Sequence, residues 1–390
     1  MKVLFVCTHL KTGGVERQWS ILLPALRKRG LDVGLLTLTA EGEFFEPVRQ
    51  AGVRVEWARM RSRVDLFGLR RALTTARWRP AVVVSNSVLG TAVAHVLAQR
   101  AGAAHIATDH SIVPALSASQ HLVRRLVARR VDGVIAVTEQ QIPALITAGY
   151  EPERISVVQS GVPELAPTRD RANARAELGL RENDFGAFMI ATLRPEKRAD
   201  FFLDAVLAAN RLDPRIRGFI VGRGKQLQRI RSLAEATGGV VQVLGEREDV
   251  PELIDAADVV CLSSSSEALP MVVIEAMALG RPVLATDVGG TSDLVVAGET
   301  GELVERDDRA AFTRALTALA ADPGRLEHYG RAARRRYEKL FTIDRMVDAY
   351  ARLLHGYGKE AEGLNGGGIS SSSDAPAETV DASENRLDVK

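Results

Sequence analysis

The sequence is poor in cysteine, with only Cys7 and Cys261 among its 390 residues. Two thiols cannot build the disulfide framework on which small secreted domains depend, so the sequence does not belong to that class. Each cysteine lies within a short apolar run. We therefore expect both to be buried free thiols, as is usual for a protein of the reducing cytosol.

Long hydrophobic runs are also lacking. The longest uncharged stretch, residues 81–99, is interrupted by hydroxyl and amide side chains and by His95, which is typical of a strand followed by a helix and not of a membrane span. The apolar segment that follows Met1 ends at Cys7 and is too short for the hydrophobic region of a signal peptide. The sequence therefore predicts a cytoplasmic protein that does not cross a bilayer.

Neither sign of charge is in large excess, because the chain has 51 basic and 49 acidic residues and a net charge of +2. The distribution is uneven, with a basic excess in residues 1–165 and an acidic excess in the remainder. A basic half suits an anionic membrane surface, an anionic substrate or a nucleic acid, and it is equally typical of an ordinary solvated face. We expect no nucleic-acid partner.

A basic amphipathic helix is predicted at Ser119–Asp132. In this segment four arginines alternate with apolar residues: Arg124, Arg125, Arg129 and Arg130 beside Leu122, Val123, Leu126 and Val127. Such helices bind anionic headgroups in a salt-sensitive way, and they also occur as core-packed helices with a solvated edge. We predict peripheral contact with the inner face of the membrane through this helix, with the solvated edge as the alternative.

The chain alternates short β-branched runs with longer amphipathic segments, a rhythm that indicates parallel sheets covered by helices on both faces. This alternation is interrupted by a polar segment near 163–171 and then resumes. We predict an α/β protein with a Rossmann-like domain at 1–165, a second Rossmann-like domain at 166–342, a helix at 343–357 that packs back on the first domain, and a disordered tail at 358–390 rich in Gly, Ser and acidic residues. The expected strands are Val3–Cys7, Val33–Leu38, Val53–Glu56, Ala81–Val84, Ala104–Thr108, Gly133–Val137, Ile155–Val158, Phe185–Thr192, Gly218–Val221, Val240–Leu244, Val259–Leu262, Val283–Thr286 and Gly301–Val304.

Two glycine-containing turns follow strands. Gly13 and Gly14 come between the first strand and its helix, where backbone N–H groups and the helix N-terminus favour an anionic ligand. The three-glycine dinucleotide fingerprint is absent, which disfavours an NAD site. The segment 222–225, Gly-Arg-Gly-Lys, lacks the Lys-Ser/Thr ending of a P-loop, so a plain turn is the better interpretation.

The segment 263–290 carries the strongest chemical signal. Four serines precede Glu267, a helix is expected from Pro270, and Glu275 lies within the first two turns of that helix among apolar neighbours. A carboxylate in such a place needs a partner or a ligand. The helix ends at Gly280, and a further strand leads to the pair Gly289-Gly290.

With this segment and the motifs that precede it, the sequence resembles the retaining glycosyltransferases of family four, which have the GT-B fold. The resemblance covers about residues 1–357 and consists of ordered motifs. They are Gly13-Gly14-Val15-Glu16-Arg17, Thr108-Asp109-His110-Ser111, Ala136-Val137-Thr138-Glu139, Ser160-Gly161-Val162, Leu193-Arg194-Pro195-Glu196-Lys197, Val221-Gly222-x-Gly224, Val250-Pro251-Glu252-Leu253 before Ala257-Asp258, and the 263–290 segment with its Ser-x-x-Glu and Glu-Ala-Met-Ala-x-Gly-x-Pro-Val.

The resemblance implies a role for each matching residue. Glu275 binds the ribose hydroxyls of a donor nucleotide, Glu267 contacts the transferred sugar, and Lys197 with Arg194 holds the diphosphate. The remaining implied site residues line the donor or the reaction centre: Gly13 and Gly14 close over phosphate or acceptor, His110 lines the reaction centre, and Ala268, Leu269, Pro270 and Met271 meet sugar and phosphate at the helix start.

Three positions depart from the family pattern. Thr192 stands where an arginine is common, so Arg194 is left to supply that charge. Ala268 replaces a glycine after the first glutamate, which puts the shape of the sugar pocket in doubt. Ser160 replaces an asparagine in the segment between the domains.

We therefore predict a metal-independent glycosyltransferase that needs no cofactor and takes its sugar from a nucleotide diphosphate-sugar, a UDP-sugar as first choice. The resemblance implies retention of configuration and a glycan or lipid-linked acceptor in polysaccharide synthesis. Lysine, arginine and helix N-termini can stabilise the leaving diphosphate without a metal. The alternatives are a nucleotide-sugar epimerase of GT-B shape, which would act on donor alone, and a non-catalytic nucleotide-sugar-binding protein.

Overall fold

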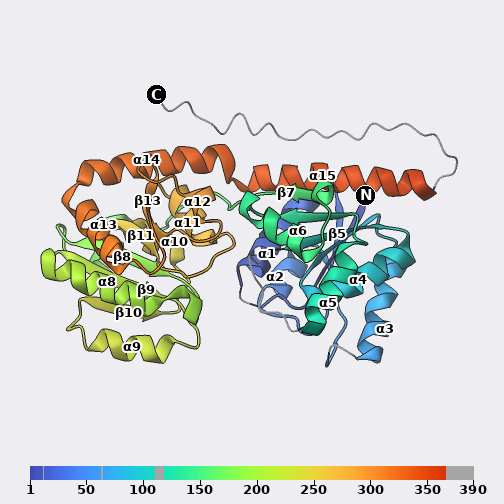
Figure 1. Ribbon diagram of the computed structural model, residues 1–390, viewed down its shortest axis with the longest axis horizontal. Coiled ribbons are helices and arrows are strands. Elements are labelled where there is room, and N and C mark those ends of the chain that lie inside the picture. The colour runs from blue at the N-terminus through green and yellow to red at the C-terminus, as the bar shows by residue number, and fades with distance from the viewer. Residues whose placement is uncertain (12, 63–64, 110–117, 366–390) are drawn as a thin grey trace.

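The computed structural model describes residues 1–11, 13–62, 65–109 and 118–365, and it shows two domains side by side (Figure 1). Each domain is built on one parallel sheet, a 7-stranded sheet of order β3-β2-β1-β4-β5-β6-β7 and a 6-stranded sheet of order β10-β9-β8-β11-β12-β13. The predicted pair of Rossmann-like domains is confirmed. The strands are β1 Lys2–Cys7, β2 Asp32–Thr37, β3 Arg54–Trp57, β4 Val82–Asn86, β5 Ala104–Asp109, β6 Gly133–Ala136, β7 Ile155–Val157, β8 Phe185–Ile190, β9 Ile216–Val221, β10 Val241–Gly245, β11 Val259–Leu262, β12 Val283–Thr286 and β13 Gly301–Val304.

Helices cover both faces of each sheet, which is why the central strands are almost wholly apolar. In β1, for example, residues 3–7 are all buried, and Val3 pairs in register with Val33 of β2 and Val82 of β4. The α-helices are α1 Gly14–Lys28, α2 Phe45–Gln50, α3 Leu66–Thr74, α4 Val88–Ala101, α5 Ala118–Ala128, α6 Ile142–Ala148, α7 Arg171–Glu177, α8 Ala199–Leu212, α9 Leu227–Glu235, α10 Val250–Ala256, α11 Met271–Ala278, α12 Thr291–Leu294, α13 Arg309–Ala321, α14 Pro323–Leu340 and α15 Ile343–Asn365.

The chain crosses between the domains twice, and the two crossings hydrogen-bond to each other. The amide of Val162 donates to the carbonyl of Phe341 at 3.0 Å, and the amide of Ile343 donates to the carbonyl of Val162 at 3.0 Å. At Gly161 a Cβ atom would lie 2.4 Å from the carbonyl oxygen of Thr342, so only glycine permits this approach. The crossings therefore form one narrow, paired connection.

Helix α15 returns to the N-terminal domain and completes its core. Met346, Val347, Tyr350 and Leu354 are buried in the cluster that also contains Trp19 of α1, and Figure 1 shows α15 lying along this domain while α14 lies along the other. The helix continues to Asn365, whereas the sequence predicted a disordered tail from residue 358. That start was wrong, because the Lys-Glu-Ala-Glu run after residue 358 favours helix and extends α15. Residues 366–390 lie outside the described part of the chain.

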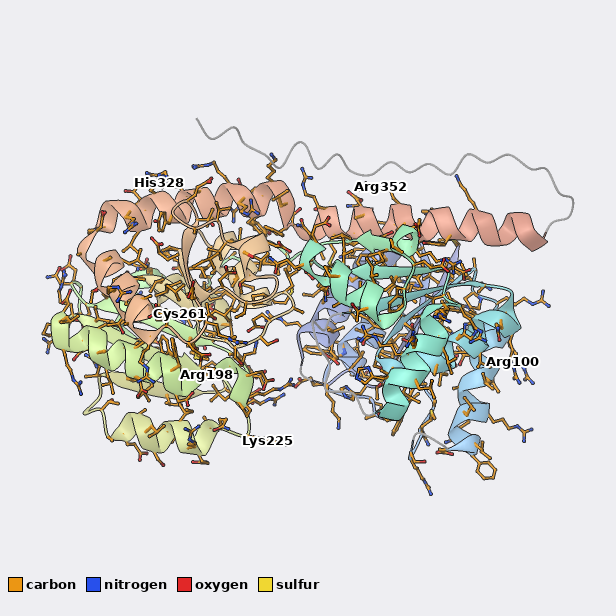
Figure 2. All side chains as sticks on the ribbon, viewed as in Figure 1. Arg100, Arg198, Lys225, Cys261, His328 and Arg352 are labelled. Atoms are coloured by element: carbon orange, nitrogen blue, oxygen red, sulfur yellow. The ribbon has the colours of Figure 1, made fainter. Side chains whose placement is uncertain are left out.

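Both cysteines are free and buried, as the sequence predicted. Cys7 ends β1, and Cys261 lies inside the C-terminal domain on β11 (Figure 2). Burial raises the pKa of both thiols, so each behaves as a small apolar core residue.

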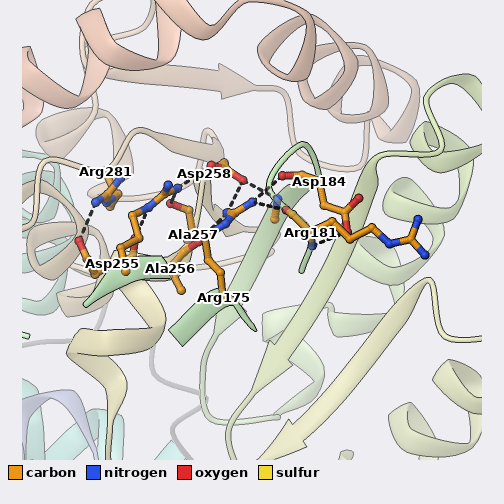
Figure 3. A network of polar contacts seen from close by, with 10 residues as sticks. Arg175, Arg181, Asp184, Asp255, Ala256, Ala257, Asp258 and Arg281 are labelled. Atoms are coloured by element: carbon orange, nitrogen blue, oxygen red, sulfur yellow. Dashed lines mark hydrogen bonds and ion pairs between the residues drawn. The ribbon is translucent and has the colours of Figure 1, made fainter. Parts of the chain in front are cut away.

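A polar network around Asp258 fixes the first helix of the C-terminal domain to the sheet (Figure 3). The Asp258 carboxylate accepts from Arg171 at 2.6 Å, from Arg175 at 2.9 Å and from the amide of Gly186 at 2.7 Å. Arg175 also donates to the carbonyl of Asp184 at 2.6 Å. These bonds join α7, the start of β8 and the start of β11, so Asp258 has a structural role at the edge opposite the strand ends that carry the site.

Candidate active site

A cleft of about 750 Å³ lies between the two domains. It is lined from the N-terminal domain by the loop after β1 and the start of α1, and from the C-terminal domain by the segments that follow β8, β9 and β11. β1 and β8 are the strands at which the order of each sheet reverses. In open α/β sheets ligands bind at this point, beyond the carboxyl ends of the strands. The cleft therefore lies where both folds independently place a ligand site.

The N-terminal wall is built on the glycine pair. A Cβ atom on Gly13 would lie 2.2 Å from Oε2 of Glu16, because the glutamate folds back over the turn, whereas Gly14 faces open space. Burial raises the pKa of Glu16, and a hydrogen bond from the backbone, together with the nearby His9 and Arg194, partly offsets this. Arg194 belongs to the opposite domain and lines the same cleft as Gly13 and Gly14.

Glu267 lies at the base of the C-terminal wall. Its side chain is 8% exposed, and its Oε1 accepts from Nζ of Lys197 and from Oγ of Ser264, each at 2.5 Å. Ser263 in turn donates to the carbonyl of Lys197 at 3.0 Å. These bonds bring the loop after β11 and the loop after β8 together, and they place a carboxylate and an ammonium side by side in the cleft.

Glu275 lies on α11, whose apolar residues pack into the C-terminal core. Its side chain is 4% exposed, and Oε1 lies 2.7 Å from Nη1 of Arg17 in the other domain. Burial raises the pKa of Glu275, and the positive charge of Arg17 lowers it in part. The second glutamate of the motif thus has an ion partner that crosses the cleft.

The second glycine of the pair that ends the motif, Gly290, lies where a side chain does not fit. A Cβ atom there would lie 2.1 Å from the carbonyl oxygen of Ala268 and 2.6 Å from Cγ2 of Thr138 in the N-terminal domain. Nearby, Gln140 donates to Ser292 across the domains at 2.5 Å. Only glycine lets the N-terminal domain approach the loop after β11 so closely.

The structure gathers the predicted site residues into this one cleft, with one exception. His110 lies outside the described residues. Those that line the cleft are Gly13, Gly14, Arg194, Lys197, Glu267, Ala268, Leu269, Pro270, Met271 and Glu275. Arg194 is 56% exposed and only loosely paired with Glu196 at 3.9 Å, so its guanidinium remains accessible beside Thr192, the position where an arginine is absent.

Several polar residues that the sequence does not mark as site residues also line the cleft: Arg17, Gln18, Arg223, Glu246 and Arg247. Arg17 belongs to the motif that begins with the glycine pair, but its ion partner, Glu275, is in the other domain and cannot be recognised from the local sequence. At Gly222 and Arg223 the sequence predicts only a plain turn. It contributes to the cleft, and Gly222 lies so close to the residue after β8 that a Cβ atom would be 1.9 Å from the carbonyl oxygen of Ala191. Among the described residues, no three His, Cys, Asp or Glu side chains are grouped as metal ligands.

Comparison with known protein families agrees with this geometry. The model of glycosyltransferase family 4 matches residues 12–164, and the model of glycosyl transferases group 1 matches residues 170–336. A D-inositol 3-phosphate glycosyltransferase of Segniliparus rotundus is 30% identical over 315 residues, which cover 74% of this chain and 70% of that protein. The chain belongs to glycosyltransferase family four.

Two further relatives are also similar to this chain. The enzyme of the same name from Nocardia farcinica is 32% identical over 76% of this chain and 66% of its own length. That from Streptomyces bingchenggensis is 34% identical over 58% of this chain, and the match spans about half of its length, 54%.

Solved structures show the same GT-B fold. HepE of Anabaena, crystallised with UDP and glucose, has a TM-score of 0.81 at 24% identity and covers 91% of this chain and 99% of its own. Sucrose-phosphate synthase of Thermosynechococcus elongatus has a TM-score of 0.76 at 21% identity, with 91% and 98% covered. The predicted GT-B architecture of this family-four chain is confirmed.

Proposed function

We propose that this chain transfers a sugar from a UDP-sugar to a hydroxyl group of a glycan or lipid-linked acceptor, with retention of anomeric configuration, in the synthesis of a cell-surface polysaccharide. One observation carries the proposal: the buried carboxylates of Glu267 and Glu275 share a cleft between two domains with the cations of Lys197 and Arg194. Carboxylates suit sugar and ribose hydroxyls, and cations suit a diphosphate. The UDP and glucose bound by HepE support the choice of donor.

In the proposed reaction the bond between the anomeric carbon and the diphosphate oxygen breaks while the acceptor oxygen bonds to that carbon. The acceptor proton passes to the leaving diphosphate. Lys197 and Arg194 stabilise the negative charge that grows on the diphosphate, and they do so best in a cleft from which water is largely excluded. Glu267 holds the sugar hydroxyls, and Glu275 holds the ribose diol.

A ligand screen followed by a transfer assay tests the function. UDP should raise the melting temperature more than GDP or ADP does, because a ligand that binds only the folded state stabilises it. Labelled UDP-sugars are then incubated with lipid-linked glycans and, as a separate arm, with D-inositol 3-phosphate, the substrate named for the relatives. Product with D-inositol 3-phosphate alone would replace the proposed acceptor, and conversion of the donor without any acceptor would favour an epimerase.

We predict that turnover needs no divalent metal. Lys197 and Arg194 supply the positive charge next to the site proposed for the diphosphate, which is the work that a metal does in other transferases. The measurement is the initial rate after dialysis against a chelator, with and without added magnesium or manganese. The rates should agree within about twofold. A rate that disappears in chelator and returns with metal would show this prediction to be wrong.

We further propose that helix α5 binds an anionic membrane surface from the N-terminal domain. Leu122 and Leu126 on this helix are 60% and 49% exposed, and Leu66 and Phe67 at the start of α3 are 76% and 78% exposed. Helix α4 packs against both α3 and α5. Among the described residues, no helix combines the length and the apolar character that crossing a bilayer would require. A surface contact is the form of membrane binding that these exposed apolar side chains support.

Vesicle sedimentation tests the membrane contact. The protein should partition to vesicles with anionic lipid at low salt, dissociate as salt rises, and ignore neutral vesicles, because each base near such a surface contributes about 1 kcal/mol that salt screens. The double variant Leu122→Ser/Leu126→Ser should lose the binding. Leu212→Ser, which changes a more exposed leucine of the C-terminal domain, is the control. Equal partitioning to neutral and anionic vesicles would end the proposal.

A further inference from the structure

An ion pair joins the two domains across the cleft at the residue assigned to the donor ribose. Arg17 lies in the first turns of α1, and its Nη1 is 2.7 Å from Oε1 of Glu275 on α11. The two side chains differ greatly in exposure, 42% for Arg17 and 4% for Glu275. The carboxylate is thus enclosed by its own domain, while its counter-ion comes from the other.

Arg17 is held in place by its own domain. The next residue, Gln18, is 1% exposed and donates to Oγ of Ser160 at 2.7 Å. Ser160 precedes the paired crossing at Val162, and Trp19 anchors the same helix turn in the core of the N-terminal domain. Helix α1 is therefore tied to the connection between the domains, and the position of Arg17 relative to Glu275 follows the arrangement of the two domains.

Among the described residues, Glu275 has no charged partner comparable to Arg17. Burial raises its pKa, and Arg17 is the charge that lowers it. The charged side chains on the elements around α11 are bonded to other groups: Arg334 of α14 to Ala278 and Glu164, Glu252 of α10 to Thr168, Asp255 of α10 to Arg281, and Lys197 to Glu267. An ionised carboxylate accepts hydrogen bonds through both oxygens, whereas a protonated one has lost part of that capacity.

We propose that Arg17 is a positioning residue for the nucleotide site. Arg17 holds the Glu275 carboxylate from across the cleft, so that the ribose site is complete only when the two domains are docked. This inference rests on the proposed function. The ribose diol donates to the lone pairs of Glu275 that Arg17 leaves open, since each carboxylate oxygen accepts more than one hydrogen bond. Arg17 thereby makes the N-terminal domain part of nucleotide recognition although it does not itself contact the nucleotide.

The test compares UDP binding by wild type and Arg17→Met as a function of pH. Loss of a positive charge at this distance raises a carboxyl pKa by about 1–3 units, so less of Glu275 is ionised at a given pH and the ionised form returns as pH rises. UDP affinity of Arg17→Met should be about tenfold or more below wild type near pH 6 and within about threefold near pH 9. Taking the ratio to wild type at each pH cancels the titration of UDP itself. Arg17→Lys should restore most of the loss at low pH.

Gln140→Ala is the matched control, because it removes a cross-domain hydrogen bond to Ser292, and neither of these two residues is among those that line the cleft. Its UDP affinity should stay within about twofold of wild type at every pH. A loss in Arg17→Met that does not change with pH would mean that Arg17 contacts the nucleotide directly, and tighter binding would mean that Arg17 obstructs the site. Either result, or no change, would overturn the inference.

A second measurement needs no ligand and so separates this inference from the proposed function. If wild type binds no nucleoside diphosphate, the proposed donor is wrong. Titration of ¹³C-labelled glutamate by NMR, with the Glu275 signal assigned by its absence in Glu275→Gln, still reports the ion pair. The Glu275 carboxyl should titrate at higher pH in Arg17→Met than in wild type, and equal titration in the two proteins would overturn the inference.

Discussion

Replacing Lys197 with alanine is expected to lower kcat by about 100- to 1000-fold, the usual cost of removing one group that stabilises charge developing in a transition state. The Lys197 ammonium lies in the cleft 2.5 Å from Glu267, where it can reach both the sugar site and the proposed diphosphate. The measurement is steady-state transfer from a UDP-sugar, with the UDP dissociation constant determined in parallel.

Lys225→Ala is the control for this substitution. Lys225 belongs to the same domain, is exposed and is not among the residues that line the cleft (Figure 2), so its removal should leave kcat unchanged. A Lys197→Ala variant that keeps kcat within about threefold of wild type would show that the charge on the leaving group is stabilised by other residues.

The second large effect is expected from Glu275→Ala, which should weaken binding of free UDP by about 10- to 150-fold. Hydrogen bonds to a charged acceptor contribute about 1.5–3 kcal/mol, and about 1.4 kcal/mol corresponds to a tenfold change in affinity. The loss should extend to free UDP because that ligand carries the ribose and lacks the sugar. Titration calorimetry with UDP measures it.

Glu267→Ala provides the contrast, because the two glutamates should fail differently. If Glu267 binds the sugar, its removal should lower turnover and relax the choice of sugar while binding of free UDP stays nearly intact. Replacing the ribose of the donor with 2′-deoxyribose should lower the donor affinity of wild type much more than that of Glu275→Ala. Equal weakening of UDP binding by both substitutions, or by neither, would contradict the roles assigned to these residues.

The fold was largely predictable because its signals are local. Strands such as Val259–Leu262 and Val283–Thr286 have the same bounds in the sequence analysis and in the structure. Buried parallel strands are continuous apolar runs, and the turns that bound them carry glycine and polar residues. The helical tail was harder, because a Gly-rich and Ser-rich composition near residue 370 obscured the helix-forming run that extends α15 to Asn365.

The site was predictable only where its residues follow one another in the chain. Glu267 and Glu275 belong to a single loop and helix, so their spacing identified them. The partner of Glu275 is Arg17, which lies 258 positions earlier in the numbering of the chain, and no local pattern connects the two. The same holds for Gly290, whose need for glycine arises from Thr138 of the other domain. Contacts across the cleft depend on how the domains dock, which periodicity and composition do not encode.

The paired crossing at Val162 and Ile343 makes the C-terminal domain a cassette inserted into the N-terminal one. Residues 163–341 enter and leave through adjacent points, while α15 beyond them belongs to the core of the N-terminal domain. Insertions whose ends lie close together are tolerated because the host keeps its own core. The C-terminal domain, to which the proposed function assigns the nucleotide-sugar, is therefore exchangeable as one continuous segment for that of a relative with another nucleotide-sugar. A carboxylate facing Arg17 is the feature that such a chimaera must retain at the seam.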